Sequence, residues 1–147
     1  MLKPLRIYLS VPMIANRNAA VAMTMARAIT DSGNEVSSPW VLEPIEAHNP
    51  TTLNIFERDM HGAEESDAIL ADVSSPSIGV GMELMAAYKA GRKVIVVAKE
   101  GSTVSRMLLH MGQKESLEFK DGEDLYVKLL RLLSPMASSR RRTVNQK

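Results

Sequence analysis

The chain has 147 residues, 45% hydrophobic and 24% charged, with a formal net charge of +1 at pH 7. This length predicts one domain with a sizeable core, and the near-neutral charge excludes a broad basic surface for nucleic acid. The absence of cysteine excludes disulfides, a thiolate nucleophile and a thiolate metal site, and the three histidines lack metal-ligand spacing, so we expect neither metal nor cofactor.

The first third of the chain predicts a strand, a helix and a weaker strand. Residues 5–11 alternate as a strand does, with Leu5, Ile7, Leu9 and Val11 on one face and Arg6, Tyr8 and Ser10 on the other. A helix is expected over residues 18–32, and Gly33 is suited to end it. Residues 36–42 predict a second strand, and Pro39 within it indicates the edge of a sheet.

The next segment predicts a helix that begins at Asn49 and Pro50, an N-cap followed by a proline at the first helical position. It is expected to run to about Ser66. Its apolar stripe consists of Leu53, Phe56, Met60 and Ala63. Asp59 borders this stripe.

The centre of the chain has the pattern of a strand–loop–helix–strand unit. Residues 68–73 and 94–98 are short apolar runs typical of buried strands. Between them Ser77 can cap a helix that contains Gly79, Gly81 and Glu83. Such a unit requires parallel strands and a right-handed crossover.

The last third predicts a short helix from Ser102 or Thr103, a strand over residues 117–119 and a final helix capped by Asp121. That helix is expected to end near Pro135. The chain then divides into a domain over residues 1–135 and a disordered basic tail over residues 136–147. Strands and helices alternate throughout, which predicts an α/β fold: a flavodoxin-like, doubly wound sheet of about five parallel strands with helices on both faces.

In such a fold the ligand crevice is expected between the carboxyl ends of the first and third strands, next to Glu83. The start of a helix would favour the ionised form of this carboxylate through the helix dipole. Taken alone, however, Glu83 and Asp59 would be ordinary surface charges, Tyr8 a core residue, and Ser77 and Ser105 a helix cap and a solvent-facing serine.

The glycine pair Gly79 and Gly81 is open to two interpretations. A dinucleotide fingerprint would need a third glycine at the position of Leu84, which argues against it. The two glycines would instead let the backbone approach a ligand or let the helix pack closely on the sheet.

The segment ADVSSPSIGVGMEL resembles the signature of the nucleoside 2-deoxyribosyltransferase superfamily, and within it the 2'-deoxynucleoside 5'-phosphate N-hydrolase branch most closely. The resemblance extends to FERDM, whose Asp59 lies 24 positions before Glu83, to Tyr8 on the first strand and to Ser105 in VSRM. It covers roughly residues 5–111.

The resemblance implies a role for each matching residue. Glu83 would be the nucleophile on the anomeric carbon, Asp59 would handle the nucleobase or its proton, and Tyr8 would orient Glu83. The 5'-phosphate would be bound near Gly79 and Gly81. Its other expected contacts are Ser77, Arg17 and, from the neighbouring subunit, Ser105.

The first loop departs from the family pattern. Val11 and Pro12 occupy the place of a Gly-Ser pair, and Ile14 stands where an arginine is usual, although Arg17 is retained. Pro12 has no backbone N–H to donate. This difference affects the phosphate contact and the preferred sugar.

The resemblance implies hydrolysis of the N-glycosidic bond of a (deoxy)nucleoside 5'-monophosphate, which needs two carboxylates and no metal. The alternatives are a deoxyribosyltransferase, a ribonucleotide N-glycosidase acting for example on CMP, and a non-catalytic nucleotide-binding module. We also expect a homodimer with shared sites, because Met82, Met85 and Tyr88 add apolar surface beyond one stripe. A cytoplasmic protein is expected, since no apolar run reaches membrane-spanning length and the N-terminus lacks a signal-peptide pattern.

Overall fold

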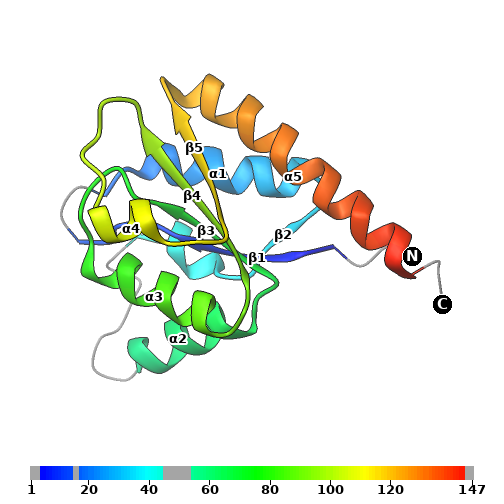
Figure 1. Ribbon diagram of the computed structural model, residues 1–147, viewed down its shortest axis with the longest axis horizontal. Helices are drawn as coiled ribbons and strands as arrows, with labels where there is room; N and C mark the ends of the chain where they lie inside the picture. Colours follow the sequence, from blue (N-terminus) through cyan, green and yellow to red (C-terminus); the bar gives the residue numbers. More distant parts are fainter. Residues whose placement is uncertain (1–3, 15–16, 45–53, 145–147) are drawn as a thin grey trace.

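A computed structural model describes residues 4–14, 17–44 and 54–144 of the protein. These residues contain one sheet of five parallel strands in the order β2-β1-β3-β4-β5 (Figure 1). The strands are β1 (Arg6–Ser10), β2 (Glu35–Val36), β3 (Ala68–Asp72), β4 (Lys93–Lys99) and β5 (Lys114–Phe119). The predicted α/β fold with a parallel sheet is therefore confirmed.

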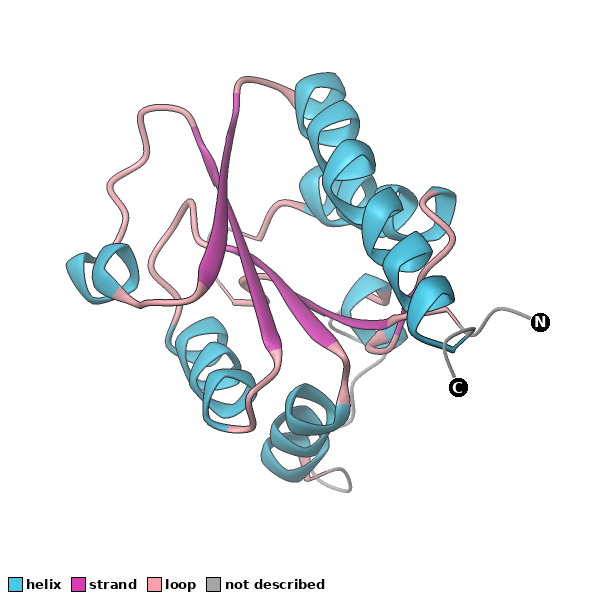
Figure 2. Cartoon of the chain, turned by 45° about the vertical axis from the view of Figure 1, so that its right-hand side comes forward, coloured by secondary structure: helices cyan, strands magenta, loops and turns pink. Residues whose placement is uncertain are grey.

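Helices cover both faces of the twisted sheet (Figure 2). Helices α1 (Ala19–Asp31) and α5 (Gly122–Val144) pack together on one face, and α2 (Ile55–Glu65) and α3 (Ile78–Lys89) on the other. A short helix, α4 (Arg106–His110), follows β4. The chain is doubly wound, as its alternation of elements predicts.

Strand β1 separates the two halves of the core by simple alternation. Ile7 and Leu9 belong to the apolar cluster under α1 and α5, whereas Tyr8 belongs to the cluster under α2 and α3. Because side chains alternate along a strand, Ser10 points to the same side as Tyr8. Strand β1 also lies between β2 and β3, so the direction of the strand order reverses at β1, and open α/β sheets place their ligands at the carboxyl end of such a strand.

Several expected helix ends are confirmed. The backbone at Gly33, just after α1, has a φ of +84°, a left-handed conformation that favours glycine. Ser77 Oγ accepts a hydrogen bond from the Val80 amide at the start of α3, and Asp121 Oδ1 accepts one from the Asp124 amide in α5.

The second predicted strand is much shorter than expected. Strand β2 does lie at the sheet edge, but residues 39–42 form a 3₁₀ helix, η1 (Pro39–Leu42). The reason is local. The Ser38 hydroxyl accepts from Leu9 N (2.8 Å) and donates to Leu9 O (3.0 Å), so the backbone groups of Leu9 bond to a side chain instead of to a longer β2. Pro39 then begins the turn without an N–H to contribute.

Helix α2 begins later than predicted. Its N-cap is Asn54, whose side chain accepts from the Glu57 amide. The predicted start at residues 49–50, and Leu53 of the predicted stripe, lie outside the described residues. Phe56 was expected to be buried but is 56% exposed, because α2 turns this side toward α3 rather than toward the sheet.

The final helix continues past Pro135 to Val144, so the predicted end near that residue was wrong. Proline removes one helical hydrogen bond. Packing around it nevertheless holds the helix on α1, since Leu133 and Met136 are both buried in the core and Asn34 Nδ2 donates to Leu133 O. The division of the chain at residue 135 stays a prediction.

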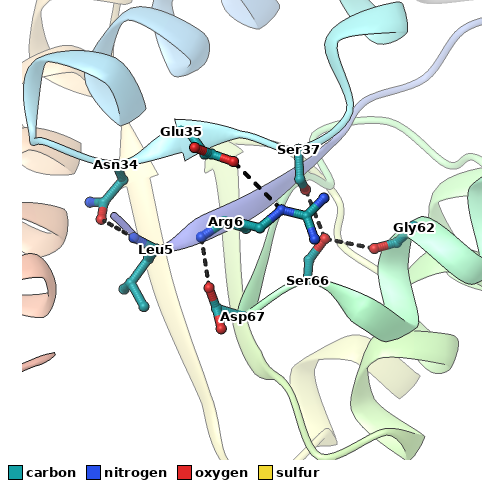
Figure 3. A network of polar contacts seen from close by, with 8 residues as sticks. All are labelled: Leu5, Arg6, Asn34, Glu35, Ser37, Gly62, Ser66 and Asp67. Carbon is teal, nitrogen blue, oxygen red and sulfur yellow. Dashed lines mark hydrogen bonds and ion pairs between the residues drawn. The ribbon is translucent and has the colours of Figure 1, made fainter. Parts of the chain in front are cut away.

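A polar network joins β1, β2 and the junction of α2 with β3 (Figure 3). The Ser66 hydroxyl lies 2.7 Å from Ser37 Oγ and donates to Gly62 O, and Asp67 Oδ2 accepts from the Arg6 amide. This network attaches the end of α2 to the sheet, which matters because Gly62 packs against Tyr8.

Candidate active site

Three elements bring Tyr8, Asp59 and Glu83 together. Tyr8 comes from the middle of β1, Asp59 from α2 and Glu83 from the second turn of α3. Tyr8 has no exposed surface and Glu83 is 9% exposed. The charge of each carboxylate raises the pKa of the Tyr8 phenol, which places all three groups in one electrostatic unit.

Glu83 is buried, contrary to the usual solvation of a helical glutamate. The pKa of its carboxyl is raised to about 7, chiefly by burial and also by the charge of Asp59, while the Tyr8 and Ser10 hydroxyls and the Arg58 guanidinium oppose this rise. The expected help from the helix dipole is too weak, because Glu83 lies beyond the first turn, where that effect fades. Glu83 is therefore poised to change protonation state near neutral pH.

The buried hydroxyls of Tyr8 and Ser10 face this carboxyl. Among the described residues neither hydroxyl completes a hydrogen bond of good geometry. Both nevertheless lie close enough to Glu83 to favour its ionised form. Burial and the two neighbouring carboxylates raise the pKa of Tyr8, so its phenol stays protonated and can donate to Glu83.

Gly62 on α2 leaves the space that the Tyr8 ring occupies. A Cβ at this position would lie 2.9 Å from Tyr8 Cε2, 3.3 Å from Tyr8 Cδ2 and 3.6 Å from Trp40 Cη2. Ordinary side chains do not tolerate the shortest of these contacts. The residue three positions after Asp59 thus fixes how closely α2 approaches β1.

Asp59 is partly buried and paired with its neighbour in sequence. Arg58 Nε lies 2.8 Å from Asp59 Oδ1, and both side chains are 20% exposed. The guanidinium carbon of Arg58 lies 4.6 Å from the centre of the Trp40 ring. Asp59 is therefore not the free surface charge that its position alone would indicate.

The start of α3 lies next to Glu83 and offers the backbone N–H groups of Ile78 and Gly79, since the Val80 N–H is already bonded to Ser77 Oγ. Gly79 and Gly81 are both exposed there. A Cβ at Gly79 would lie 3.9 Å from Glu83 Oε1, and one at Gly81 would meet no described residue within 4 Å. Close packing on the sheet therefore does not explain either glycine, and the space beside the carboxyl is left open.

Two further predicted residues lie apart from this cluster. Ser105 is the exposed N-cap residue of α4. Arg17 Nη2 donates to the carbonyl oxygens of Glu43 (2.7 Å) and Val41 (3.3 Å), at the end of η1. In this arrangement Arg17 holds the loop after η1, and its contact with a substrate stays a prediction.

Within the described residues, no group of three or more histidine, aspartate or glutamate side chains could hold a metal ion. None of the helices that the structure describes is both long and apolar enough to cross a membrane.

The model of one family, described as nucleoside 2-deoxyribosyltransferase, matches residues 7–125, which contain every site residue named above. The chain belongs to this family. At its C-terminal end this match reaches further than the sequence resemblance, which covers roughly residues 5–111. It includes β5 and the beginning of α5.

Relatives of this deoxyribosyltransferase-family chain are named "Putative 2'-deoxynucleoside 5'-phosphate N-hydrolase 1". The one from Methanococcoides burtonii is 39% identical over 89 residues, covering 58% of this chain and 72% of the relative. The one from Thermofilum pendens is 33% identical over 97 residues, covering 64% and 68%. Among solved structures, the CMP N-glycosidase of Clostridium botulinum superposes with a TM-score of 0.62 at 18% identity, over 84% of this chain and 97% of that one, which shows the shared fold.

Four residues beside the site were not singled out from the sequence of this family member: Ser10, Trp40, Arg58 and Gly62. For Ser10 a signal exists, because it lies two positions after Tyr8 and therefore on the same face of β1. For the other three no local pattern is informative, since their contacts join residues from η1, α2 and β1.

Proposed function

We propose that this protein hydrolyses the N-glycosidic bond of (deoxy)nucleoside 5'-monophosphates, releasing the free base and the sugar 5-phosphate. The observation that carries the proposal is the buried Glu83 carboxyl, which faces the hydroxyls of Tyr8 and Ser10 and feels the charge of Asp59. The names of its relatives point to the same class of substrate.

The reaction proceeds in two steps. Ionised Glu83 attacks C1' of the sugar, the bond from C1' to the base nitrogen breaks, and Asp59 assists protonation of the departing base. Water then attacks C1' and the bond to the Glu83 oxygen breaks, which regenerates the carboxylate. The proton that this water gives up returns to Asp59 in place of the one delivered to the base. Splitting one displacement into two is the advantage of a covalent intermediate, and two carboxylates are what glycoside cleavage requires.

Tyr8 orients the nucleophile throughout this cycle. Its phenol is protonated and lies close enough to donate to Glu83 when that group is ionised. When the carboxylate becomes an ester its charge disappears, so this hydrogen bond weakens and is available again when the ester is cleaved. Tyr8 thus holds the Glu83 carboxylate in the same orientation before the first step and after the second.

The phosphate binds at the start of α3, where free N–H groups and the helix dipole favour an anion. Ser77 contacts it directly, and the absent side chains at Gly79 and Gly81 let the ligand approach the backbone. Charge-assisted hydrogen bonds contribute about 1.5–3 kcal/mol each. Monophosphates should therefore be preferred over free nucleosides by at least about tenfold.

We also propose a cytoplasmic homodimer in which Ser105 reaches the phosphate bound to the partner. An apolar groove of about 580 Å³ lies between α2 and α3 and supports this assembly. Its apolar lining includes Phe56, Met60, Met82 and Met85. Phe56, Met82 and Met85 are each more than 40% exposed, so a two-fold partner would cover them.

The test is a panel of deoxyribonucleotides, ribonucleotides and nucleosides, each incubated with and without a second base and analysed for free base and new nucleoside. Free base and sugar phosphate from monophosphates support the proposal, with the Glu83→Gln variant as the inactive control. New nucleoside formed only with an acceptor base would identify a transferase, and ribonucleotide-only cleavage would identify a ribonucleotide N-glycosidase. Tight nucleotide binding without cleavage would identify a binding module.

A further inference from the structure

The Arg58–Asp59 pair is unusual in its geometry. Consecutive residues of an α-helix project about 100° apart, so neighbouring side chains do not normally face each other. Here Arg58 Nε lies 2.8 Å from Asp59 Oδ1, which requires the arginine to fold back over the helix. A contact outside α2 accompanies this conformation.

The indole of Trp40 makes this contact. The guanidinium carbon of Arg58 lies 4.6 Å from the ring centre, a distance typical of a cation–π contact. Arginine suits this role better than lysine, since its planar group stacks on a ring while its N–H groups still reach a carboxylate.

Trp40 is itself fixed on the scaffold of the site. Its ring meets Tyr8 edge-on, with ring centres 6.1 Å apart and planes inclined by 65°. Ser38, two residues earlier, is hydrogen-bonded through its side chain to both backbone groups of Leu9 in β1. The platform under Arg58 is thus attached to the strand that carries Tyr8.

The charges in the site explain why an arginine is placed beside Asp59. Two carboxylates in one partly buried site resist simultaneous ionisation. Asp59 opposes ionisation of Glu83, and Arg58 favours it. Among the described residues, the other groups that act on Glu83 are the Tyr8 and Ser10 hydroxyls, which are uncharged. Within the part of the chain that the structure describes, the counter-charge of the two carboxylates is therefore Arg58, a cation stacked on an aromatic ring.

We propose that Arg58, stacked on Trp40, is a positioning residue that fixes the Asp59 carboxylate beside the substrate and supplies the positive charge shared by the two carboxylates. The inference rests on the proposed function. Trp40 acts through Arg58, and neither residue bonds to the reacting atoms.

The first test compares Arg58→Gln with Arg58→Lys and with Arg27→Gln. Arg27 is a matched control, because its guanidinium carbon lies 4.3 Å from the ring centre of Tyr126, on the opposite face of the sheet. Arg58→Gln should lower kcat about 10- to 100-fold and move the acidic limb of kcat/KM to higher pH. Arg58→Lys should keep the limb near its original position but not restore kcat fully, and Arg27→Gln should change neither.

The role of Trp40 is tested by a double-mutant cycle. Trp40→Leu should lower kcat, Trp40→Phe should largely restore it, and Trp40→Leu combined with Arg58→Gln should be no worse than Arg58→Gln alone. Additive losses would show that Trp40 acts independently of Arg58 and would overturn this part. Melting temperatures of all variants distinguish a folding defect from a positioning defect.

A direct titration separates this inference from the proposed function. The Glu83 carboxyl, labelled with carbon-13, should titrate at a higher pH in Arg58→Gln than in the wild type or in Arg27→Gln. An unchanged titration overturns the inference whether or not the protein is active. Conversely, a wild-type protein that releases no base from any nucleotide overturns the proposed function while the titration still decides the role of Arg58.

Discussion

The ring of Tyr8 lies so close to the backbone of Gly62 that a Cβ on this glycine would come within 2.9 Å of Tyr8 Cε2. The ring cannot turn away easily, because Tyr8 is fully buried. Helix α2 carries Asp59 and, one turn later, the gap at Gly62 that receives the Tyr8 ring. Because both positions lie on α2, the packing of α2 against β1 determines the geometry of the site.

The first prediction concerns this gap. Gly62→Ala should lower kcat about tenfold or more, because the new methyl group displaces the Tyr8 phenol from Glu83. The matched control is Gly122→Ala, at the first position of α5, where a Cβ would lie 3.7 Å from Thr24 Oγ1, an ordinary contact. Steady-state kinetics decide: equal activity of the two variants would mean that the position of the Tyr8 ring is unimportant.

Glu83→Gln should abolish turnover and leave the fold intact, since an amide cannot act as the nucleophile. It should also change stability in a pH-dependent way. The folded protein raises the pKa of Glu83 from 4.5 to about 7, so it binds this proton more tightly than the unfolded chain does. The resulting stability is present below pH 4.5 and is lost as pH rises through 7.

The size of that loss is about 3 kcal/mol at most, from 1.36 kcal/mol per pKa unit. Glutamine carries no charge at any pH, so the Glu83→Gln variant does not suffer this loss of stability. Denaturant unfolding should therefore show Glu83→Gln to be more stable than the wild type at pH 8.5 and about equal to it at pH 4.5. A variant that is equally or less stable at pH 8.5 would contradict the burial of an ionisable carboxyl.

The hydroxyl of Ser10 is predicted to help ionise Glu83. Ser10→Ala should raise the pKa of that carboxyl, so activity should fall more at pH 6 than at pH 8, and the acidic limb of kcat/KM should move to higher pH. Tyr8→Phe should produce the larger shift, because its hydroxyl opposes the rise more strongly. A Ser10→Ala loss that is the same at every pH would indicate a packing defect instead.

Asp59 is predicted to assist departure of the base. Asp59→Asn should reduce turnover most for substrates whose base is a poor leaving group, because such bases depend most on protonation. Rates measured across a series of bases, at saturating substrate, give the dependence. If the loss is small and uniform along the series, Asp59 has no part in leaving-group departure.

The proposed dimer gives the last prediction. Sedimentation at micromolar concentration should show twice the chain mass, and Met85→Glu, which places a charge in the groove between α2 and α3, should return the chain to a monomer. If sites are shared, mixed Glu83→Gln and Ser105→Ala chains should form heterodimers with one intact site, so activity should exceed the mean of the parents. A wild-type monomer with full activity would contradict the proposed dimer.

The sequence by itself determined the order of elements and the faces of β1. Alternation along a strand is local, so Ile7 and Leu9 on one side and Tyr8 on the other follow from the pattern alone. The caps at Ser77 and Asp121 follow from hydrogen bonds that span only three residues. The family motif made Glu83, Asp59 and Tyr8 candidates, since the motif around Glu83, the 24 positions from Asp59 to Glu83 and the place of Tyr8 on the first strand can be read from the sequence.

Only the tertiary structure decided the environment of these groups. Whether Glu83 is solvated depends on the elements that pack around it. Its pKa near 7 results from burial together with groups on β1 and α2. The fold-back of Arg58 onto Asp59 depends on a tryptophan 18 positions earlier in the sequence, and the early end of β2 depends on Ser38 bonding to Leu9. Electrostatic and packing energies act through space, so contacts between distant segments escape a pattern that is read along the chain.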